Sequence, residues 1–166
     1  MSGDTPWVDS DLVIPRALLD EVQAHARQEY PSESCGFLLG PNADAQRLDE
    51  VHREVNEADK YHQLDPERFP RTSHTYFKIN ELRAARLFDS AATGERPVKV
   101  IYHSHCDTGA YFSEEDAATF AIEGVLMWPC AFLVVSVRDG QVDDHKLWTH
   151  VDGTGEFVER TLRIED

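Results

Sequence analysis

Two histidines separated by a single residue stand at the end of an apolar, β-branched run. His103 and His105 follow Val98 to Tyr102 directly, with Ser104 between them. Side chains alternate along a strand, so the two imidazoles are expected on one face and Ser104 on the other. A catalytic zinc site uses three protein ligands and leaves one position for water, and this pair could supply two. The spacing also arises by chance, so a purely structural role stays open for the pair alone.

A third candidate ligand lies further along the chain. Seven residues separate His105 from Ser113, and two more separate Ser113 from Asp116. If Asp116 sits in the first turn of a helix, the intervening loop can fold its carboxylate back toward the end of the strand. However, Ser-x-x-Asp is also a helix N-terminal capping signature. From these residues alone, Asp116 is therefore either a metal ligand or a cap.

Taken together, these positions resemble the JAMM motif of MPN-type metalloproteases, with no mismatch in spacing. Upstream, Glu33-Ser34-Cys35-Gly36-Phe37-Leu38 is similar to the glutamate segment of that family, in which a Glu precedes a small residue and Cys-Gly. A fainter similarity includes Asn56 and the segment from Tyr76 to Asn80. In the order of its elements, the resemblance extends from about Leu12 to Val151.

The resemblance implies one Zn²⁺ per chain, held by His103, His105 and Asp116, with water as the fourth ligand. Glu33 would be the general base that activates this water and then protonates the leaving amine. The Ser113 hydroxyl would stabilise the developing oxyanion. Outside the resemblance, Glu33 would be interpreted as a solvated acid in a turn.

Neighbouring residues raise further possibilities. Cys106 stands where many members of the family have proline, and strand alternation directs its side chain to the face opposite His105, so we do not expect it to be a ligand. Tyr111 and Phe112 either line the substrate cleft or pack onto their own helix. The remaining histidines are expected to be surface or structural residues: His25, His52, His62, His74, His145 and His150.

Two other zinc-enzyme classes do not fit. Nucleoside deaminases need His-x-Glu followed by Pro-Cys-x-x-Cys. Here His105 occupies the Glu position, and Leu133 stands where the second cysteine would follow Pro129-Cys130. His-Glu-x-x-His, the signature of the zincins, does not occur. The remaining alternative is a zinc-binding MPN scaffold module without hydrolytic activity.

The resemblance also implies a substrate class. Small single-domain prokaryotic members of the family are linked to ubiquitin-like or sulfur-carrier proteins with a Gly-Gly tail. The expected reaction is hydrolysis of a peptide or isopeptide bond at the C-terminus of such a protein. Isopeptide cleavage and trimming of the tail are both open, and a homodimer is possible.

The surrounding pattern predicts the elements that position these residues. We expect an α/β fold with a mixed, partly antiparallel sheet flanked by helices, a JAB1/MPN-like domain with layering like that of cytidine deaminases. Residues 1–166 would form one domain, with a flexible N-terminus over residues 1–11. Helices are expected after Pro15, over 81–92 and after Ser113, and residues 56–75 resemble a long loop. Strands are expected over 35–40, 48–55, 75–79, 98–102, 131–137 and 143–151, with a hairpin turn at 139–140 and an ambiguous segment over 157–164.

Composition limits the possible partners and location. The chain has 166 residues, 41% of them hydrophobic, and a formal net charge of −15. This charge repels phosphate backbones, so neither nucleic acid nor an anionic membrane is an expected partner. No apolar run approaches the ~20 residues of a membrane span, and the acidic start lacks the pattern of a secretory signal. Three cysteines without CxxC spacing indicate reduced thiols. We expect a soluble, cytoplasmic protein.

Overall fold

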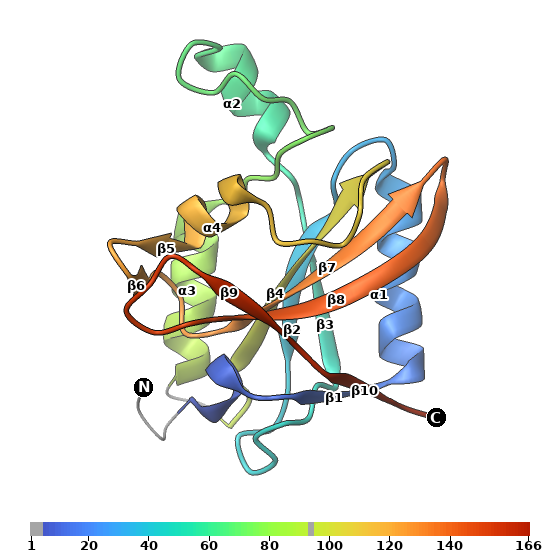
Figure 1. The fold of residues 1–166 in the computed structure, drawn as a ribbon, viewed down its shortest axis with the longest axis vertical. Coiled ribbons are helices and arrows are strands. Elements are labelled where there is room, and N and C mark those ends of the chain that lie inside the picture. Colours follow the sequence, from blue (N-terminus) through green and yellow to red (C-terminus); the bar gives the residue numbers. More distant parts are fainter. Residues whose placement is uncertain (1–4, 93–94) are drawn as a thin grey trace.

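A six-stranded mixed sheet forms the centre of the fold (Figure 1). The computed structural model describes residues 5–92 and 95–166. In spatial order, the strands are β3 (Glu50–Glu54), β2 (Cys35–Leu39), β4 (Val98–Cys106), β7 (Ala131–Arg138), β8 (Gln141–His150) and β9 (Phe157–Arg160). Only the pair β4 and β7 is parallel within this order. The expected mixed, partly antiparallel sheet is confirmed.

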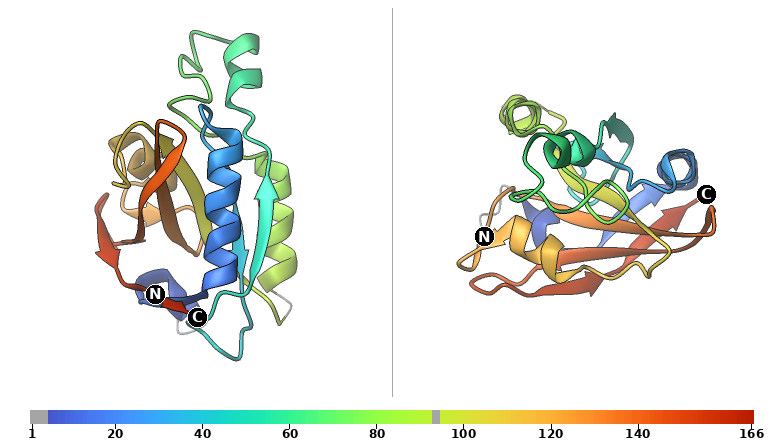
Figure 2. Two further views of the ribbon diagram at one scale, coloured as in Figure 1. Left: turned by 90° about the vertical axis from the view of Figure 1, so that its right-hand side faces the viewer. Right: turned by 90° about the horizontal axis from the view of Figure 1, so that it is seen from above.

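Helices lie on both sides of β2 and β4 (Figures 1 and 2). The helices are α1 (Arg16–Glu29), α2 (Ala58–Leu64), α3 (Glu81–Ala92) and α4 (Glu114–Phe120). Because side chains alternate along a strand, Leu38, Val100 and Tyr102 face the core that includes α1. Phe37 and Ile101 face the second core, which includes α3 and the end of α4. Strand β4 therefore has apolar residues packed against both faces, and it is buried along its whole length.

The turn between β7 and β8 follows the expected hairpin chemistry. Asp139 and Gly140 both have positive φ, at 49° and 78°. A two-residue turn of this kind matches the right-handed twist of the strands it joins. The segment over 157–164, which was ambiguous from sequence, forms strands in both halves, namely β9 and β10 (Leu162–Glu165).

The N-terminal segment differs from the expectation of a flexible start. Residues 1–4 lie outside the described residues, but Pro6–Asp9 forms a 3₁₀ helix in which Trp7 and Val8 are buried. The Trp7 indole donates a hydrogen bond to the carbonyl of Pro129 (3.1 Å). Strand β1 (Leu12–Pro15) then pairs in parallel with β10. Two large apolar side chains packed in the core outweigh the polar character of this segment.

Two expectations for residues 56–79 were wrong. Residues 56–75 are not a plain loop, because α2 forms within them and extends from the end of the molecule (Figure 1). Residues 75–79 do not form a strand, although they are β-rich. Their backbone groups pair instead with residues 56 and 57: Lys78 N–H donates to Asn56 Oδ1 (3.0 Å), and Glu57 N–H donates to the Lys78 carbonyl (2.8 Å).

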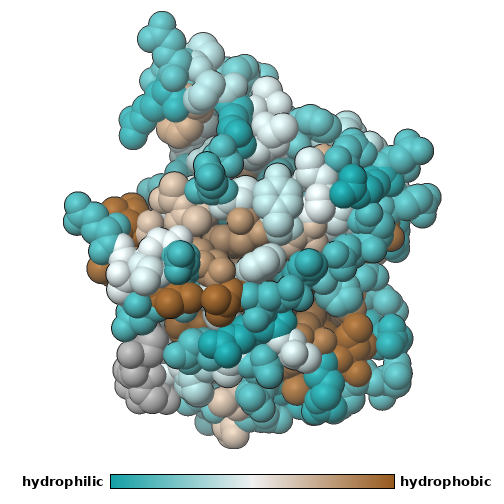
Figure 3. Space-filling view, in the orientation of Figure 1, coloured by the Kyte–Doolittle hydropathy of each residue, from teal (hydrophilic) through white to brown (hydrophobic). Residues whose placement is uncertain are grey.

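The remaining elements are short and lie beside α4. Strands β5 (Ala121–Ile122) and β6 (Val125–Leu126) form a small hairpin. The helix after Ser113 thus ends at Phe120, and Gly124 lies in the hairpin turn with φ of 78°. Among the described residues, no helix is both long and apolar enough to cross a membrane. The face seen in Figure 3 is largely hydrophilic.

Candidate metal centre

The two histidines lie near the end of β4, a strand that is buried along its whole length. His103 pairs with Cys35 of β2 on one side and Val134 of β7 on the other, so strands on both sides hold the backbone of β4 at this point. The alternation places both imidazoles on one face, as expected. His103 is fully buried and His105 is 5% exposed. A site built here starts from a rigid backbone.

Asp116 completes a cluster, which we call the His–His–Asp triad. Its Oδ2 lies 3.0 Å from His103 Nε2 and 3.2 Å from His105 Nε2, and the two Nε2 atoms are 3.2 Å apart. A tetrahedral Zn²⁺ with ligand bonds of about 2.0–2.1 Å has its ligand atoms about 3.3–3.4 Å from one another. The observed spacing is within a few tenths of an ångström of this value. Among the described residues, these three are the side chains that form a potential metal-binding group, with ligand atoms that all lie within 4.8 Å of one another.

The surroundings of the imidazoles favour metal binding through Nε2. His105 Nδ1 lies 2.9 Å from the carbonyl of Gly109, which can only accept, so Nδ1 carries the proton and Nε2 presents its lone pair. The His103 ring stacks on Phe77 at 4.3 Å between centroids. His103 Nδ1 has no hydrogen-bond partner among the described residues. A cation between the Nε2 atoms and the carboxylate fits this donor set.

Ser113 and Asp116 form a capping box at the start of α4. Asp116 N–H donates to Ser113 Oγ (3.0 Å), and Ser113 N–H donates to Asp116 Oδ2 (3.1 Å). The same Oδ2 faces both imidazoles. The sequence left open whether Asp116 is a helix cap or a candidate metal ligand. In the structure it is placed to be both, because the capping hydrogen bonds direct its carboxylate toward the imidazoles.

The side chains of the triad affect one another's pKa. Burial disfavours the carboxylate of Asp116, but the neighbouring imidazoles outweigh burial and hold its pKa well below the ordinary range. Burial lowers the pKa of His103, which favours the neutral imidazole that binds metals. A carboxylate beside two imidazoles is a donor set typical of zinc sites.

Glu33 lies beside the triad rather than in it. Its side chain is 5% exposed, and burial together with the nearby Asp116 raises its carboxyl pKa to about 9. Its backbone N–H donates to the carbonyl of Ser73 (2.7 Å), and its carbonyl accepts from Asn56 Nδ2 (3.0 Å). The strand that follows approaches its neighbours closely, since a Cβ at Gly36 would lie 2.4 Å from the His52 carbonyl. This accounts for glycine after Cys35.

A polar cavity of about 170 Å³ is lined by Glu33, by Ser113 and by two of the triad residues, His105 and Asp116. Cys106 also lines it, but its thiol is not part of the triad. Tyr111 lines the cavity and meets the His105 ring edge to face at 5.0 Å, whereas Phe112 packs in the second core. The lining comprises Glu33, Arg71, His74, Thr75, Tyr76, His105, Cys106, Thr108, Tyr111, Ser113, Glu115 and Asp116.

Some residues of this site were missed from the sequence. His74 was expected at the surface or in a structural role, and Arg71 was not singled out, but both line the cavity. Nothing in their local pattern marks them, because they come from an irregular segment. The other histidines are away from the triad; His25, for example, pairs with the Tyr102 hydroxyl (2.7 Å) on the α1 side.

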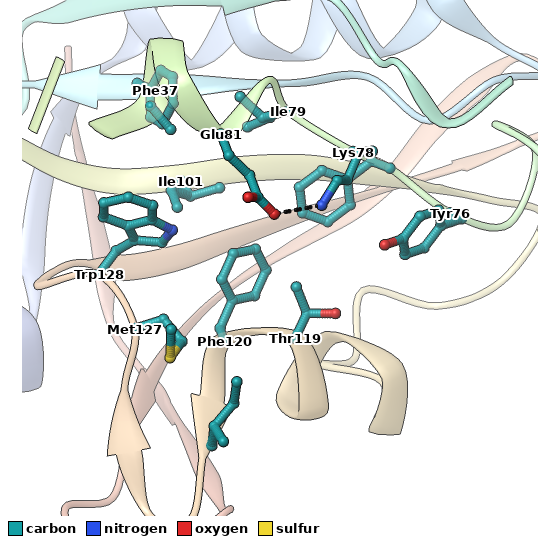
Figure 4. A pocket seen from close by; sticks show the side chains of 13 residues that line it. Phe37, Tyr76, Lys78, Ile79, Glu81, Ile101, Thr119, Phe120, Met127 and Trp128 are labelled. Carbon is teal, nitrogen blue, oxygen red and sulfur yellow. Dashed lines mark hydrogen bonds and ion pairs between the residues drawn. The ribbon is translucent and has the colours of Figure 1, made fainter. Parts of the chain in front are cut away.

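A second, apolar cavity of about 270 Å³ is lined in part by Phe77, whose ring stacks on His103 of the triad. Figure 4 shows Phe37, Ile101, Phe120 and Trp128 around it, with the ion pair between Lys78 and Glu81 at its edge. This cavity contains none of the triad residues. Its lining is mostly apolar, whereas Glu33, His105, Ser113 and Asp116 line the polar cavity.

Comparison with known proteins decides the family. Residues 15–151 match the family model described as prokaryotic homologs of the JAB domain. This chain belongs to the prokaryotic JAB family. The resemblance to JAMM and MPN proteins that the motif indicated is thereby confirmed.

Relatives of this prokaryotic JAB protein cover most of its length. It is 29% identical over 143 residues to the CysO-cysteine peptidase of Mycobacterium tuberculosis, covering 86% of this chain and 84% of the relative. The solution structure of DSY2949 from Desulfitobacterium hafniense is similar with a TM-score of 0.66, 20% identity and 93% of each chain covered. A structure described as "JAMM: A Metalloprotease-like Zinc Site in the Proteasome and Signalosome" is similar with a TM-score of 0.51 and 16% identity, covering 95% of this chain and all of that one. At these identities, the two structures establish the fold.

Proposed function

We propose that this protein is a JAMM-type zinc metallopeptidase that hydrolyses a bond at the C-terminus of a ubiquitin-like or sulfur-carrier protein. The observation that carries the proposal is the His–His–Asp triad, whose ligand atoms lie 3.0–3.2 Å apart and two of whose members, His105 and Asp116, line one cavity with Glu33 and Ser113. The substrate class follows from the M. tuberculosis relative, whose name is CysO-cysteine peptidase.

His103, His105 and Asp116 would hold one Zn²⁺ per chain. Bound there, the ion would polarise the scissile carbonyl and lower the pKa of a water molecule. The chain would contribute to this binding by fixing His105 through Gly109 and Asp116 through the cap of α4. Such outer hydrogen bonds orient ligands and typically affect metal affinity 10- to 100-fold.

Glu33 would carry the proton between water and the leaving amine. Its side chain lines the cavity close enough to Asp116 for their charges to interact. The carboxylate form of a buried glutamate with a raised pKa is a stronger base than a free one, so it can accept a proton from water and then return it, which general acid–base catalysis requires. Hydrolysis then balances: the carbonyl carbon of the tail gains OH from water, and the departing amine gains H.

Ser113 would stabilise the oxyanion. Its Oγ accepts from Asp116 N–H, so the hydroxyl hydrogen is available for a group in the cavity. One donor of this kind typically contributes about 2.7–4 kcal/mol to transition-state stabilisation.

Incubation with tail-extended carrier proteins tests the proposal. Purified protein is mixed with a ubiquitin-like protein whose Gly-Gly tail is extended by one residue or linked to a lysine, and products are followed by mass spectrometry. We expect cleavage after Gly-Gly that stops with a chelator and returns with Zn²⁺. Glu33→Gln should retain zinc and lose about 10²–10⁴-fold in kcat. Full activity in that variant would refute the assigned base, and zinc binding with no cleavage by the wild type would favour a scaffold.

A further inference from the structure

One wall of the polar cavity comes from residues 71–76, which connect α2 to α3. Arg71, His74, Thr75 and Tyr76 contribute to it. The opposite wall comes from the end of β4 and the start of α4. At about 30 Å³ per water molecule in liquid, a cavity of about 170 Å³ has the volume of five or six waters, which suits one small amino acid.

The cavity wall formed by residues 71–76, which we call the Arg71 wall, is fixed to the segment that contains Glu33. Ser73 accepts from Glu33 N–H (2.7 Å), and its own N–H and hydroxyl each donate to the Asp59 carboxylate (2.8 Å). His74 Nδ1 lies 2.7 Å from the carbonyl of Pro31. The wall is thus built into the structure, and the position of Arg71 relative to Glu33 is defined.

The Arg71 guanidinium is held at both ends of its fork. Nη1 donates to the carbonyl of Thr75 (3.1 Å), and Nη2 donates to Glu115 Oε1 (2.9 Å). These bonds engage two of its five N–H donors. The pair with Glu115 is 42% and 48% exposed at its two side chains, and exposed pairs contribute only about 0–1 kcal/mol. A carboxylate arriving in the cavity can therefore replace Glu115 at little cost.

The charge of Arg71 stands out from its surroundings. It is the only arginine or lysine among the described residues lining the cavity, which also contains Glu33, Glu115 and Asp116. It acts electrostatically on Glu33, lowering the pKa of that carboxyl against the larger effect of burial. Arg71 and Glu33 thus line the same cavity, close enough for their charges to interact.

We infer that Arg71 is a specificity-determining residue that binds the free α-carboxylate of a single C-terminal amino acid as it leaves. In an amino acid, the carboxylate is bonded to the same carbon as the amine, so a cation near Glu33 is within its reach. Arginine recognises carboxylates through paired N–H donors. The inference rests on the proposed function and selects trimming of one residue over cleavage of a lysine isopeptide.

The reaction has a simple balance. Water adds OH to the carbonyl carbon of the terminal glycine of the carrier, the C–N bond breaks, and the amine of the departing residue takes the remaining proton. The products are the carrier with a free Gly-Gly terminus and one amino acid, whose carboxylate is unchanged throughout. No oxidant, reductant or further reactant is needed.

Matched substrates test the role of Arg71. A semisynthetic ubiquitin-like carrier is prepared with one cysteine after Gly-Gly, either as the free acid or as the C-terminal amide. We expect the wild type to prefer the acid about 10- to 100-fold in kcat/KM, the range of a charge-assisted hydrogen bond. In Arg71→Gln the ratio of acid to amide should fall to about one. Arg68→Gln, whose guanidinium lies over the Phe69 ring outside the cavity, should keep the wild-type ratio.

A binding measurement separates this inference from the proposed function. Because the Glu33→Gln variant should not turn over, calorimetry can measure its affinity for the acid carrier and for the amide carrier. The same two affinities are then measured for the double variant that also carries Arg71→Gln. Loss of the acid preference on adding Arg71→Gln supports the carboxylate subsite even if the wild type cuts neither carrier. Cleavage or binding of acid and amide at equal strength by proteins with Arg71 intact would overturn it while leaving the proposed hydrolysis in place. Glu115→Gln should strengthen the acid preference, because it removes the competing carboxylate.

Discussion

Asp116 Oδ2 accepts from the backbone N–H of Ser113 at 3.1 Å, and the backbone N–H of Asp116 donates to Ser113 Oγ at 3.0 Å. This reciprocal pair ends the loop that returns from β4, and it holds the carboxylate against His103 and His105. A common helix-capping device thus positions the third candidate metal ligand.

Replacing Ser113 should therefore affect stability and turnover together. Ser113→Ala removes the cap, which should lower the free energy of unfolding by about 0.5–2 kcal/mol. It also removes the proposed oxyanion donor, which should lower kcat by about 10²–10³-fold. Ser113→Thr retains a hydroxyl and should recover most of the stability. Denaturant unfolding and steady-state kinetics measure both effects, and an Ala variant with wild-type kcat would exclude the oxyanion role.

Asn56 joins the Glu33 segment to the Arg71 wall. Its Nδ2 donates to the carbonyls of Glu33 and Tyr76 (both 3.0 Å), and its Oδ1 accepts from Ala58 N–H (2.9 Å) and Lys78 N–H (3.0 Å). At about 0.5–1.5 kcal/mol per bond, losing these four bonds in Asn56→Ala should lower the free energy of unfolding by about 2–6 kcal/mol.

Asn56→Asp provides the matched comparison, because it keeps both acceptor bonds and loses both donors. This variant should place a carboxylate against the carbonyls of Glu33 and Tyr76, and the repulsion should displace Glu33. We therefore expect a lower kcat with an unchanged zinc content. Thermal unfolding, zinc analysis and kinetics distinguish the two variants. Wild-type stability in Asn56→Ala would show that these four bonds do not hold the segment.

Lys99 predicts a pH-dependent stability. It is fully buried in β4, and its Nζ donates to the carbonyls of Pro41 (2.9 Å), Asp44 (2.8 Å) and Arg47 (2.9 Å). Burial lowers its pKa to about 8, whereas an unfolded lysine titrates near 10.4. Between these values the unfolded chain binds more protons, so the contribution of Lys99 to stability increases as pH rises from about 8 toward 10.

Comparison with Lys99→Met isolates this effect. At pH 7 the variant should lose about 2–4 kcal/mol, because three buried carbonyls lose their donor. The stability difference from the wild type should widen by on the order of 2 kcal/mol by pH 10. Urea unfolding at several pH values measures it. Parallel stability curves for the two proteins would show that the Lys99 pKa is not lowered.

The fold was predictable where local pattern and burial agree. The alternation at His103 and His105, the Asp139-Gly140 turn and the apolar run of β7 each indicated the element that the structure contains. The pattern failed between Asn56 and Ile79. There the backbone conformation depends on the side chain of Asn56 and on contacts with the Glu33 segment, which are distant in sequence.

The residues of the candidate site were also predictable only in part. The spacing of the motif indicated the residues of the triad, Glu33 and Ser113. The structure groups the triad, and all of these residues except His103 line one cavity, while their chemical roles stay predictions. Arg71 and His74 could not be identified, because neither spacing nor periodicity connects an irregular segment to a cavity. Trp7 was missed for a similar reason, since its partner Pro129 is 122 residues away.

Zinc content tests the central claim most directly. Metal analysis of the purified protein should find one Zn²⁺ per chain in the wild type, in Glu33→Gln and in Glu114→Gln, a control on an exposed acid of α4 outside the cavity. His103→Ala should hold almost none, and neither should Asp116→Asn, whose side chain can still accept the cap hydrogen bond. Full zinc occupancy in both of the last two variants would contradict a metal centre at His103, His105 and Asp116.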